Sequence, residues 1–274
     1  MGRQRYSSSR VARPGQSTDP VRYCSLGSGS KGNATAAVEG THALLIDCGF
    51  SRKSAMERME LAGVDSSRLS AVLVTHEHGD HAKGALALCE LLDIPLYASF
   101  GTALRMSWLE HPLFRAIESE DVFEIEGFRV RPVIVPHDSR EPLQFVIEAR
   151  SEKRLGVLSD LGCVTRNIVK AYQGCHGLQL EANHDPVMLR NGPYPPKLQA
   201  RVAGNYGHLS NRQCAELISC LAWSGLQSVT AGHISEKNNA EQLVRQELSA
   251  ALACTPDSVT LLPQDEPSAW FELR

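Results

Sequence analysis

The stretch VLVTHEHGDHAKG, Val72–Gly84, places three histidines and an aspartate within six residues, directly after an apolar run. The preceding residues, Ala71–Thr75, are apolar and β-branched, which predicts a buried strand. His76 and His78 are two residues apart, so they point the same way if the chain is still extended. The sequence therefore predicts a strand that ends in a cluster of polar side chains.

That cluster has the composition of a metal site. Gly79 tolerates positive φ and lets the chain turn, so that Asp80 and His81 can face the same point from the other side. Neutral imidazoles and a carboxylate are good ligands for a zinc-like divalent ion. Solvated loop histidines are the ordinary interpretation of a single His. Burying so dense a cluster without a metal would leave several polar groups short of partners.

Length and composition limit the other possibilities. The chain has 274 residues, 42% of them hydrophobic, which is enough for one large domain or two small ones. The net charge of −3 creates no global basic field. No apolar run approaches the ~18 residues of a membrane span, and no signal peptide is recognisable, which favours a cytoplasmic protein. The eight cysteines are scattered without a CxxC pair, which favours reduced thiols.

Strand-like and helix-like segments alternate along the chain. Residues 1–19 are rich in Ser and Arg and predict a disordered tail, and residues 20–274 predict the folded domain. Many strands with interspersed helices suggest two sheets packed face to face, with helices outside. Helices are predicted over residues 51–62, 82–93, 211–222 and 238–252.

Three further strand ends carry metal-competent side chains. The segments VIVPHDS, GVLSDLG and VTAGHIS place His137, Asp160 and His233 just past apolar strands. Each alone is ordinary turn chemistry. Their recurrence beside the histidine cluster indicates one functional edge.

These segments together resemble the metallo-β-lactamase superfamily. LLIDCG, THEHGDH, VPHD, LSDLG and AGHIS occur in the superfamily's order, and the resemblance covers about residues 21–274. It implies an α+β fold, a four-layer αββα sandwich. It also implies two divalent ions, Zn or Mn, with Asp160 bridging them and Asp47 orienting the site from outside the ligand set. The implied ligands are His76, His78 and His137 for one metal, and Asp80, His81 and His233 for the other.

Two such ions can lower the pKa of a shared water and so produce a hydroxide nucleophile. Asp80 is the candidate to orient it. The segment NYGHLSN adds His208 and Ser210 before a helix, where an anion can bind. This segment is similar to a His-x-Ser or His-x-Thr element of the superfamily's nucleases and phosphodiesterases, and the resemblance implies that His208 binds phosphate or helps protonate the leaving group. Ser210 is a substrate-binding candidate, although helix capping would explain it equally.

A long segment after the strand GLQLEAN holds further candidates. Asn183 and His184 follow the strand end and are candidates for substrate contact. Asp185 followed by Pro186 predicts a helix N-cap. The proline-rich loop RNGPYPP either walls the substrate cleft, with Tyr194, Lys197 and Arg201, or is a rigid connector with solvated charges.

Several of these segments resemble one bacterial branch of the superfamily, the WalJ/YycJ-type proteins. The matching blocks are SLGSGSKGN, THEHGDHAKG, NHDPVMLRNGPYP, GHLSN and HISEKNN. The resemblance implies a phosphodiesterase, most specifically a DNA exonuclease, with nucleic acid or another phosphodiester as its substrate. The alternatives are a thiolester or lactone hydrolase, and a non-catalytic scaffold with this fold. The sequence leaves the oligomeric state open.

Overall fold

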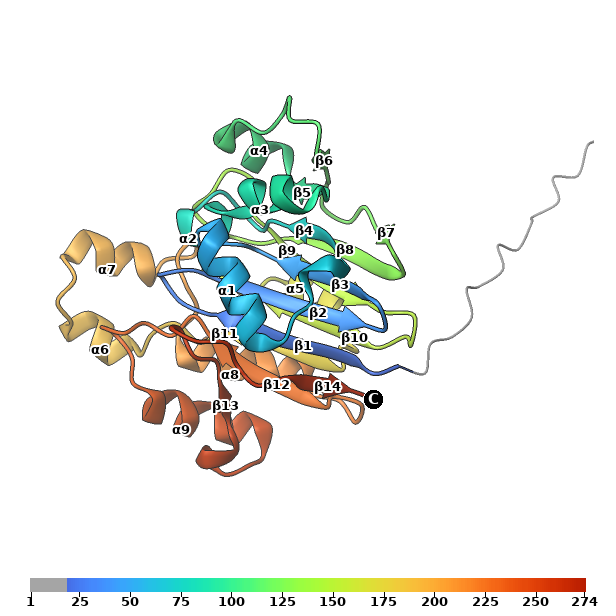
Figure 1. The fold of residues 1–274 in the computed structure, drawn as a ribbon. Coiled ribbons are helices and arrows are strands. Elements are labelled where there is room, and N and C mark those ends of the chain that lie inside the picture. Colours follow the sequence, from blue (N-terminus) through green and yellow to red (C-terminus); the bar gives the residue numbers. More distant parts are fainter. Residues whose placement is uncertain (1–18) are drawn as a thin grey trace, which may run out of the picture.

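The computed structural model describes residues 19–274, and two seven-stranded sheets form its centre (Figure 1). The predicted tail over residues 1–19 lies, except for its last residue, outside this range. The first sheet has the order β14 (Phe271–Leu273), β1 (Val21–Gly27), β2 (Ala34–Glu39), β3 (His42–Ile46), β4 (Leu69–Leu73), β5 (Leu96–Ala98), β6 (Phe114–Ala116). The second has the order β13 (Thr260–Leu261), β12 (Ser228–Gly232), β11 (Gly177–Glu181), β10 (Arg154–Leu158), β9 (Leu143–Glu148), β8 (Phe128–Ile134), β7 (Phe123–Ile125).

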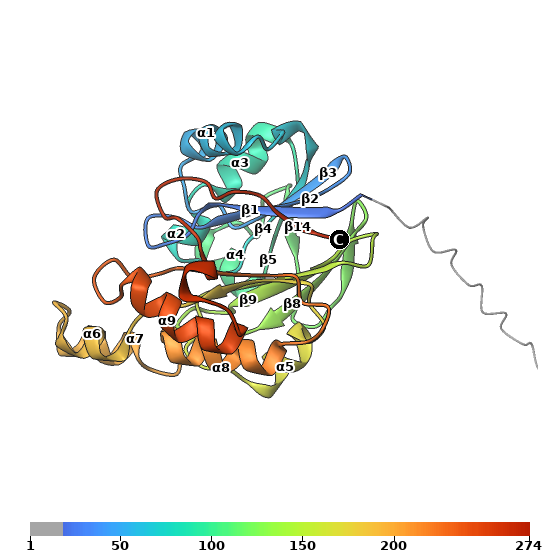
Figure 2. The same cartoon turned by 90° about the horizontal axis from the view of Figure 1, so that it is seen from below.

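Helices cover the outer face of each sheet, so the predicted αββα sandwich is confirmed (Figure 2). The first sheet carries α1 (Arg52–Ala62), α2 (Gly79–Ala82), α3 (Ala85–Leu92) and α4 (Phe100–Met106) on its side of the molecule. The second carries α5 (Arg166–Tyr172), α8 (Asn211–Leu221) and α9 (Glu241–Leu252). Two further helices, α6 (Pro186–Asn191) and α7 (Pro196–Val202), project from one edge. Single 3₁₀ turns occupy Ser66–Arg68 and Pro256–Ser258.

Three apolar clusters hold the layers together. The central cluster lies between the sheets and includes Tyr23, Phe128 and Phe145, none of which is more than 1% exposed. The other two fill the spaces between each sheet and its helices. Each sheet is therefore buried on both faces, one against the other sheet and one against the helices. This double burial explains why the strands are nearly continuous hydrophobic runs in the sequence. None of the helices within residues 19–274 combines the length and apolar character needed to cross a membrane.

Most predicted element boundaries agree with the structure, and two helices differ from their predicted bounds. The helix predicted over residues 82–93 is two helices, α2 and α3, which are separated at Lys83 and Gly84. A Cβ atom at Gly84 would lie 2.0 Å from the carbonyl oxygen of Phe50, so the chain needs glycine at this close approach. The helix predicted over 238–252 begins only at Glu241, because the Asn239 side chain accepts a hydrogen bond from the Ala240 backbone N–H.

We predict that Phe145→Ala lowers the free energy of unfolding by about 3–5 kcal/mol, because it empties the centre of the inter-sheet core. Urea unfolding of the full chain measures this change. The matched control is Phe100→Ala on α4, where the ring is 58% exposed and the expected change is within about 0.5 kcal/mol. Equal destabilisation by both substitutions would contradict the packing described above.

Candidate metal centre and active site

One edge of the sandwich collects side chains from six strand ends. At this edge lie the C-terminal ends of six strands, β3, β4, β8, β10, β11 and β12, and the start of α2. Because β3 and β4 are parallel, as are β10, β11 and β12, the residues after them meet. The side chains gathered in this way are Asp47, His76, His137, Asp160, Glu181 and His233, with His78, Asp80 and His81 on the turn into α2.

The first predicted ligand set forms a compact group. His76 Nε2 lies 3.0 Å from His78 Nδ1, which in turn lies 3.3 Å from His137 Nε2. Two nitrogens that each lie about 2.0–2.1 Å from one tetrahedral zinc are roughly 3.3 Å apart. Burial and the neighbouring charge of His81 hold the pKa of His76 well below its usual value. The group therefore presents ring nitrogens at a spacing that suits one ion.

The second predicted set lies beside the first. Asp80 Oδ2 is 3.7 Å from both His81 Nε2 and His233 Nε2. Asp160 Oδ2 is 2.7 Å from His81 Nε2, and the same aspartate also groups with His76 of the first set. The structure thus brings all seven predicted ligands together and places Asp160 between the two sets.

One buried atom supports the presence of a cation. His233 Nε2 has no hydrogen-bond partner among the described residues, although the ring is 4% exposed. An unpartnered polar atom at this depth is costly unless a group outside the chain satisfies it. The donor set is imidazole and carboxylate, which zinc and manganese both accept. The residues therefore fit a divalent metal.

Groups outside the ligand sets hold the imidazoles in place. Asp47 Oδ2 lies 2.7 Å from His81 Nδ1, and Asp47 also accepts hydrogen bonds from the backbone and hydroxyl of Thr75. The Gly207 carbonyl oxygen lies 3.1 Å from His137 Nδ1. Such contacts orient a ligating ring and select its tautomer. The structure thus places Asp47 where an orienting carboxylate is needed.

Three of these residues have left-handed backbone conformations. Asp47, Asp160 and His233 have φ values of 61°, 50° and 52°. Non-glycine residues are uncommon in this region, although Asp and His are among those that tolerate it. The conformation turns each side chain sharply out of its strand. Six other non-glycine residues of the described chain also have positive φ, so this conformation is not confined to the site.

Glu181 is a site residue that the sequence analysis missed. It ends β11, is 1% exposed, and lies 2.8 Å from both His208 Nδ1 and His233 Nδ1. It also accepts hydrogen bonds from the Leu161 and Leu209 backbone N–H groups. Burial raises its pKa, but the charge and hydrogen bonds of the two histidines prevail and lower the pKa of Glu181 to about 2. Its position at a strand end, like Asp160, was the signal in the sequence.

His208 lies beside both carboxylates. Its Nδ1 is 2.8 Å from Glu181 and 3.2 Å from Asp160 Oδ1. Burial lowers the pKa of His208, but the Glu181 and Asp160 carboxylates raise it to about 9. With Nδ1 engaged, Nε2 is the nitrogen left for a ligand in the adjacent cavity. This arrangement favours a protonated imidazole that faces a negatively charged group.

The other predicted substrate residues, Ser210, Asn183 and His184, lie near His208, and each makes different hydrogen bonds. Ser210 forms a capping box with Gln213 at the start of α8, so its hydroxyl is fully used there. Asn183 lines the cavity and donates to the His233 carbonyl oxygen at 2.9 Å. His184 is buried, and its Nδ1 has no partner within the described chain. Substrate contact by these three residues stays a prediction.

A cavity of about 340 Å³ opens over the metal-competent residues. This volume is near the lower end of the roughly 300–1,000 Å³ typical of ligand sites. Its lining includes Ser30, His78, Asp80, Asp160, Asn183, Tyr194, Arg201, His208, His233 and Ser235.

Comparison with known proteins identifies the family to which the chain is similar. A family model described as a beta-lactamase superfamily domain matches residues 42–234. The chain is 29% identical over 240 residues to exodeoxyribonuclease YycJ of Bacillus anthracis, covering 85% of this chain and 89% of the relative. It is 29% identical over 238 residues to exodeoxyribonuclease WalJ of Streptococcus pneumoniae, covering 85% and 88%.

A crystal structure of the metallo-beta-lactamase fold protein YhfI from Bacillus subtilis superposes with a TM-score of 0.69 at 14% identity. The alignment covers 93% of this chain and the whole of that one. At this identity the likeness concerns the fold, and it agrees with the four layers described above.

We predict that Asp47→Asn weakens metal binding by about 10–100-fold, because the amide no longer supports the orientation and basicity of His81. Competition with a chromogenic chelator measures the affinity. Asp93→Asn, at the exposed C-cap of α3, is the matched control and should bind metal like the unchanged chain. Unaltered affinity in Asp47→Asn would remove this aspartate from the metal centre.

Proposed function

Because the chain belongs to the beta-lactamase superfamily, we propose that its site cleaves phosphodiester bonds in DNA, and that it acts as an exonuclease. The chain is a metal-dependent hydrolase of this superfamily. The phosphodiester proposal rests on the pairing of His208 with Glu181 at the cavity wall. The two exodeoxyribonucleases that share 29% identity over most of their length support the same substrate class.

We propose a site for two divalent ions, zinc or manganese. His76, His78 and His137 would hold one ion, and Asp80, His81 and His233 would hold the other, with Asp160 between them. When bound, such ions supply Lewis acidity and make a water molecule acidic enough to act as a nucleophile. Metal ions bound there would compete with protons for the imidazole nitrogens of His81 and His233, because a ligating imidazole must be deprotonated.

In this proposal the chain's own residues orient the attacking water, bind the phosphate and donate a proton to the leaving group. Asp80 Oδ2 lies between His81 and His233 and is placed to orient the attacking water. Glu181 holds His208 through Nδ1, so that Nε2 faces a phosphate in the cavity. A protonated His208 binds the phosphate oxygen and gives its proton to the departing alkoxide. The buried carboxylate keeps that imidazole charged until the proton transfers.

The two alternative functions are less well supported. A non-catalytic scaffold would not need seven metal-competent residues grouped at one edge, with a buried nitrogen unpartnered. A thiolester hydrolase would need the same metal centre but would gain little from a proton-donating imidazole, because a thiolate leaves without a proton. A lactone hydrolase would use such a donor, and it is disfavoured only by the exodeoxyribonuclease relatives. The first experiment below separates both hydrolases from the phosphodiesterase.

We predict that the metal-stripped protein, refilled with Zn²⁺ or Mn²⁺, hydrolyses DNA strands to mononucleotides or short products. Gel and mass analysis of products from strands with and without a 5′ phosphate measures the cleavage and its polarity. Asp80→Asn should abolish activity and so controls for contaminating nuclease. Efficient cleavage of thiolesters or lactones, with no phosphodiester cleavage by either metal form, would overturn the proposal.

We predict that His208→Ala lowers kcat on DNA by about 10²–10⁴-fold, because the leaving alkoxide loses its proton donor. The loss should be much smaller on bis(p-nitrophenyl) phosphate, since p-nitrophenolate departs without a proton. Metal content should be unchanged. His111→Ala, away from the site beside Glu90, is the matched control. Equal losses on both substrates would argue against proton donation by His208.

A further inference from the structure

The pair of helices α6 and α7 stands out from the body of the molecule. Together with the loop that joins them, residues 186–202 form an arm that projects from the edge of the sandwich on the side of α2 (Figures 1 and 2). The arm lies between two site residues in the sequence, Glu181 and His208. Tyr194 and Arg201 of the arm are among the residues that line the cavity.

The arm has an unusual charge. Residues 186–202 contain three basic residues, Arg190, Lys197 and Arg201, and no acidic one, in a chain whose net charge is −3. Arg190 and Lys197 are exposed and have no ion pair or hydrogen-bond partner in residues 19–274. Their charges are therefore available to a ligand. A second copy of the same arm would repel them, which disfavours self-association through this face.

The root of the arm is firmly attached beside the metal-competent residues. The Arg201 guanidinium donates to Asp138, the neighbour of His137 in sequence. The His208 backbone N–H donates to the Val202 carbonyl oxygen at 2.9 Å, and Gln199 Nε2 donates to the Tyr194 carbonyl oxygen at 2.9 Å. The arm thus presents its charges at a defined position relative to the site.

Two tyrosines complete this surface. Tyr194 lines the cavity, and Lys237 Nζ lies 5.9 Å from the centre of its ring. Tyr206 is 65% exposed, while its carbonyl oxygen accepts a hydrogen bond from the Asp138 backbone N–H at 3.0 Å. Basic side chains combined with exposed aromatic rings are the usual means of holding single-stranded nucleic acid, whose bases stack on the rings.

We propose that the arm, together with Tyr206, binds a single strand of the nucleic acid whose end occupies the cavity. Arg190 and Lys197 contact backbone phosphates, and Tyr194 and Tyr206 stack on unpaired bases. This inference rests on the proposed phosphodiesterase function and deepens it. It assigns to the substrate several nucleotides of unpaired strand beside the scissile bond, which a cavity of about 340 Å³ alone would not require.

Kinetics on two substrates of different length test the arm. The full-length, metal-loaded Arg190→Ala/Lys197→Ala double variant is compared with the unchanged chain on a single-stranded oligodeoxynucleotide and on bis(p-nitrophenyl) phosphate, over a range of salt concentrations. For the oligonucleotide, log(kcat/KM) falls as log[salt] rises. Loss of two phosphate contacts should make this negative slope less steep by about 1.4. The small substrate, which does not reach the arm, should be cleaved as before. Tyr206→Leu should raise KM for the oligonucleotide by about fivefold or more.

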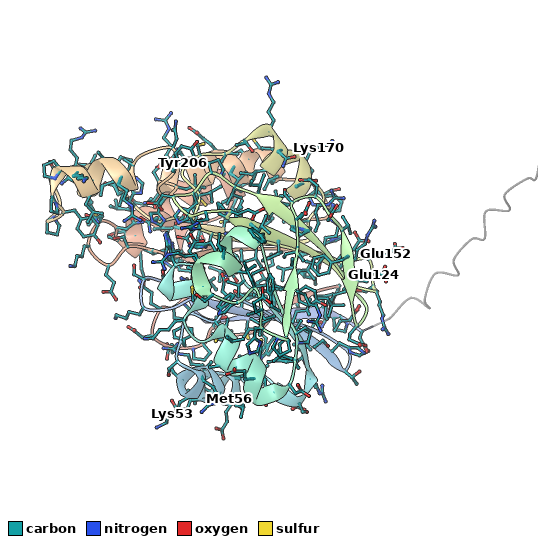
Figure 3. All side chains as sticks on the ribbon, turned by 90° about the horizontal axis from the view of Figure 1, so that it is seen from above. Lys53, Met56, Glu124, Glu152, Lys170 and Tyr206 are labelled. Carbon is teal, nitrogen blue, oxygen red and sulfur yellow. The ribbon has the colours of Figure 1, made fainter. Side chains whose placement is uncertain are left out.

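The matched control removes two charges elsewhere. Arg129 and Lys170 line a separate cavity on the outer face of the second sheet, and Figure 3 shows Lys170 well away from Tyr206. Arg129→Ala/Lys170→Ala should behave like the unchanged chain on both substrates. If it reduces the salt slope as much as the arm variant does, the arm has no special role and the inference fails.

The remaining outcomes separate the two proposals. Normal oligonucleotide kinetics in the arm variant would overturn the inference and leave the phosphodiesterase standing. If the unchanged chain cleaves neither substrate, the phosphodiesterase fails, and fluorescence anisotropy with a labelled single strand still tests the arm. Binding that the arm variant loses would support strand recognition, and absence of binding would overturn it. A dimer in size-exclusion chromatography that the variant loses would reassign the arm to self-association.

Discussion

The structure depends on how buried carboxylates are compensated at one edge of the sandwich. Asp47, Asp160 and Glu181 are each 5% exposed or less, and a carboxylate at that depth is costly unless it is paired. Each lies within hydrogen-bonding distance of an imidazole nitrogen: Asp47 and Asp160 contact His81, and Glu181 contacts His208 and His233. The charges at this edge therefore stabilise one another as a network. A divalent ion bound by the same imidazole and carboxylate donors would complete it.

The layers of the fold make this compensation possible. The inter-sheet core keeps the two sheets in register, so that strand ends from both sheets meet at the same edge. Close approaches then fix the loops. A Cβ atom at Gly49 would lie 1.8 Å from the carbonyl oxygen of Asp80, and one at Gly162 would lie 2.2 Å from the carbonyl carbon of Asn205. Small residues at these points hold the metal-competent turn and the segment before His208 against the rest of the site.

Chemistry and recognition come from different parts of the chain. The residues grouped for metal binding come from strand ends and from the turn into α2, which the core makes rigid. The proposed recognition surface comes from the arm of α6 and α7, which projects from the body of the molecule, and from the loop after it (Figure 1). Arg201 links the two parts through its bond to Asp138. Such a division lets substrate preference vary on a conserved type of fold, because function resides in sites carried by the fold.

The sequence by itself determined the layered α+β fold and the set of candidate metal ligands, because apolar strands and dense histidine motifs are local patterns. The boundaries of α1 and α8 were also predictable, since Ser51, Gly63 and Ser210 act within a few residues of themselves. Only the tertiary structure decided the role of Glu181, whose partners His208 and His233 lie 27 and 52 residues away. It also decided that Ser210 is used by its capping box, and that the proline-rich segment is a projecting arm. Local patterns are visible in a sequence because neighbouring residues create them, whereas contacts between distant strand ends exist only after the sheets have packed.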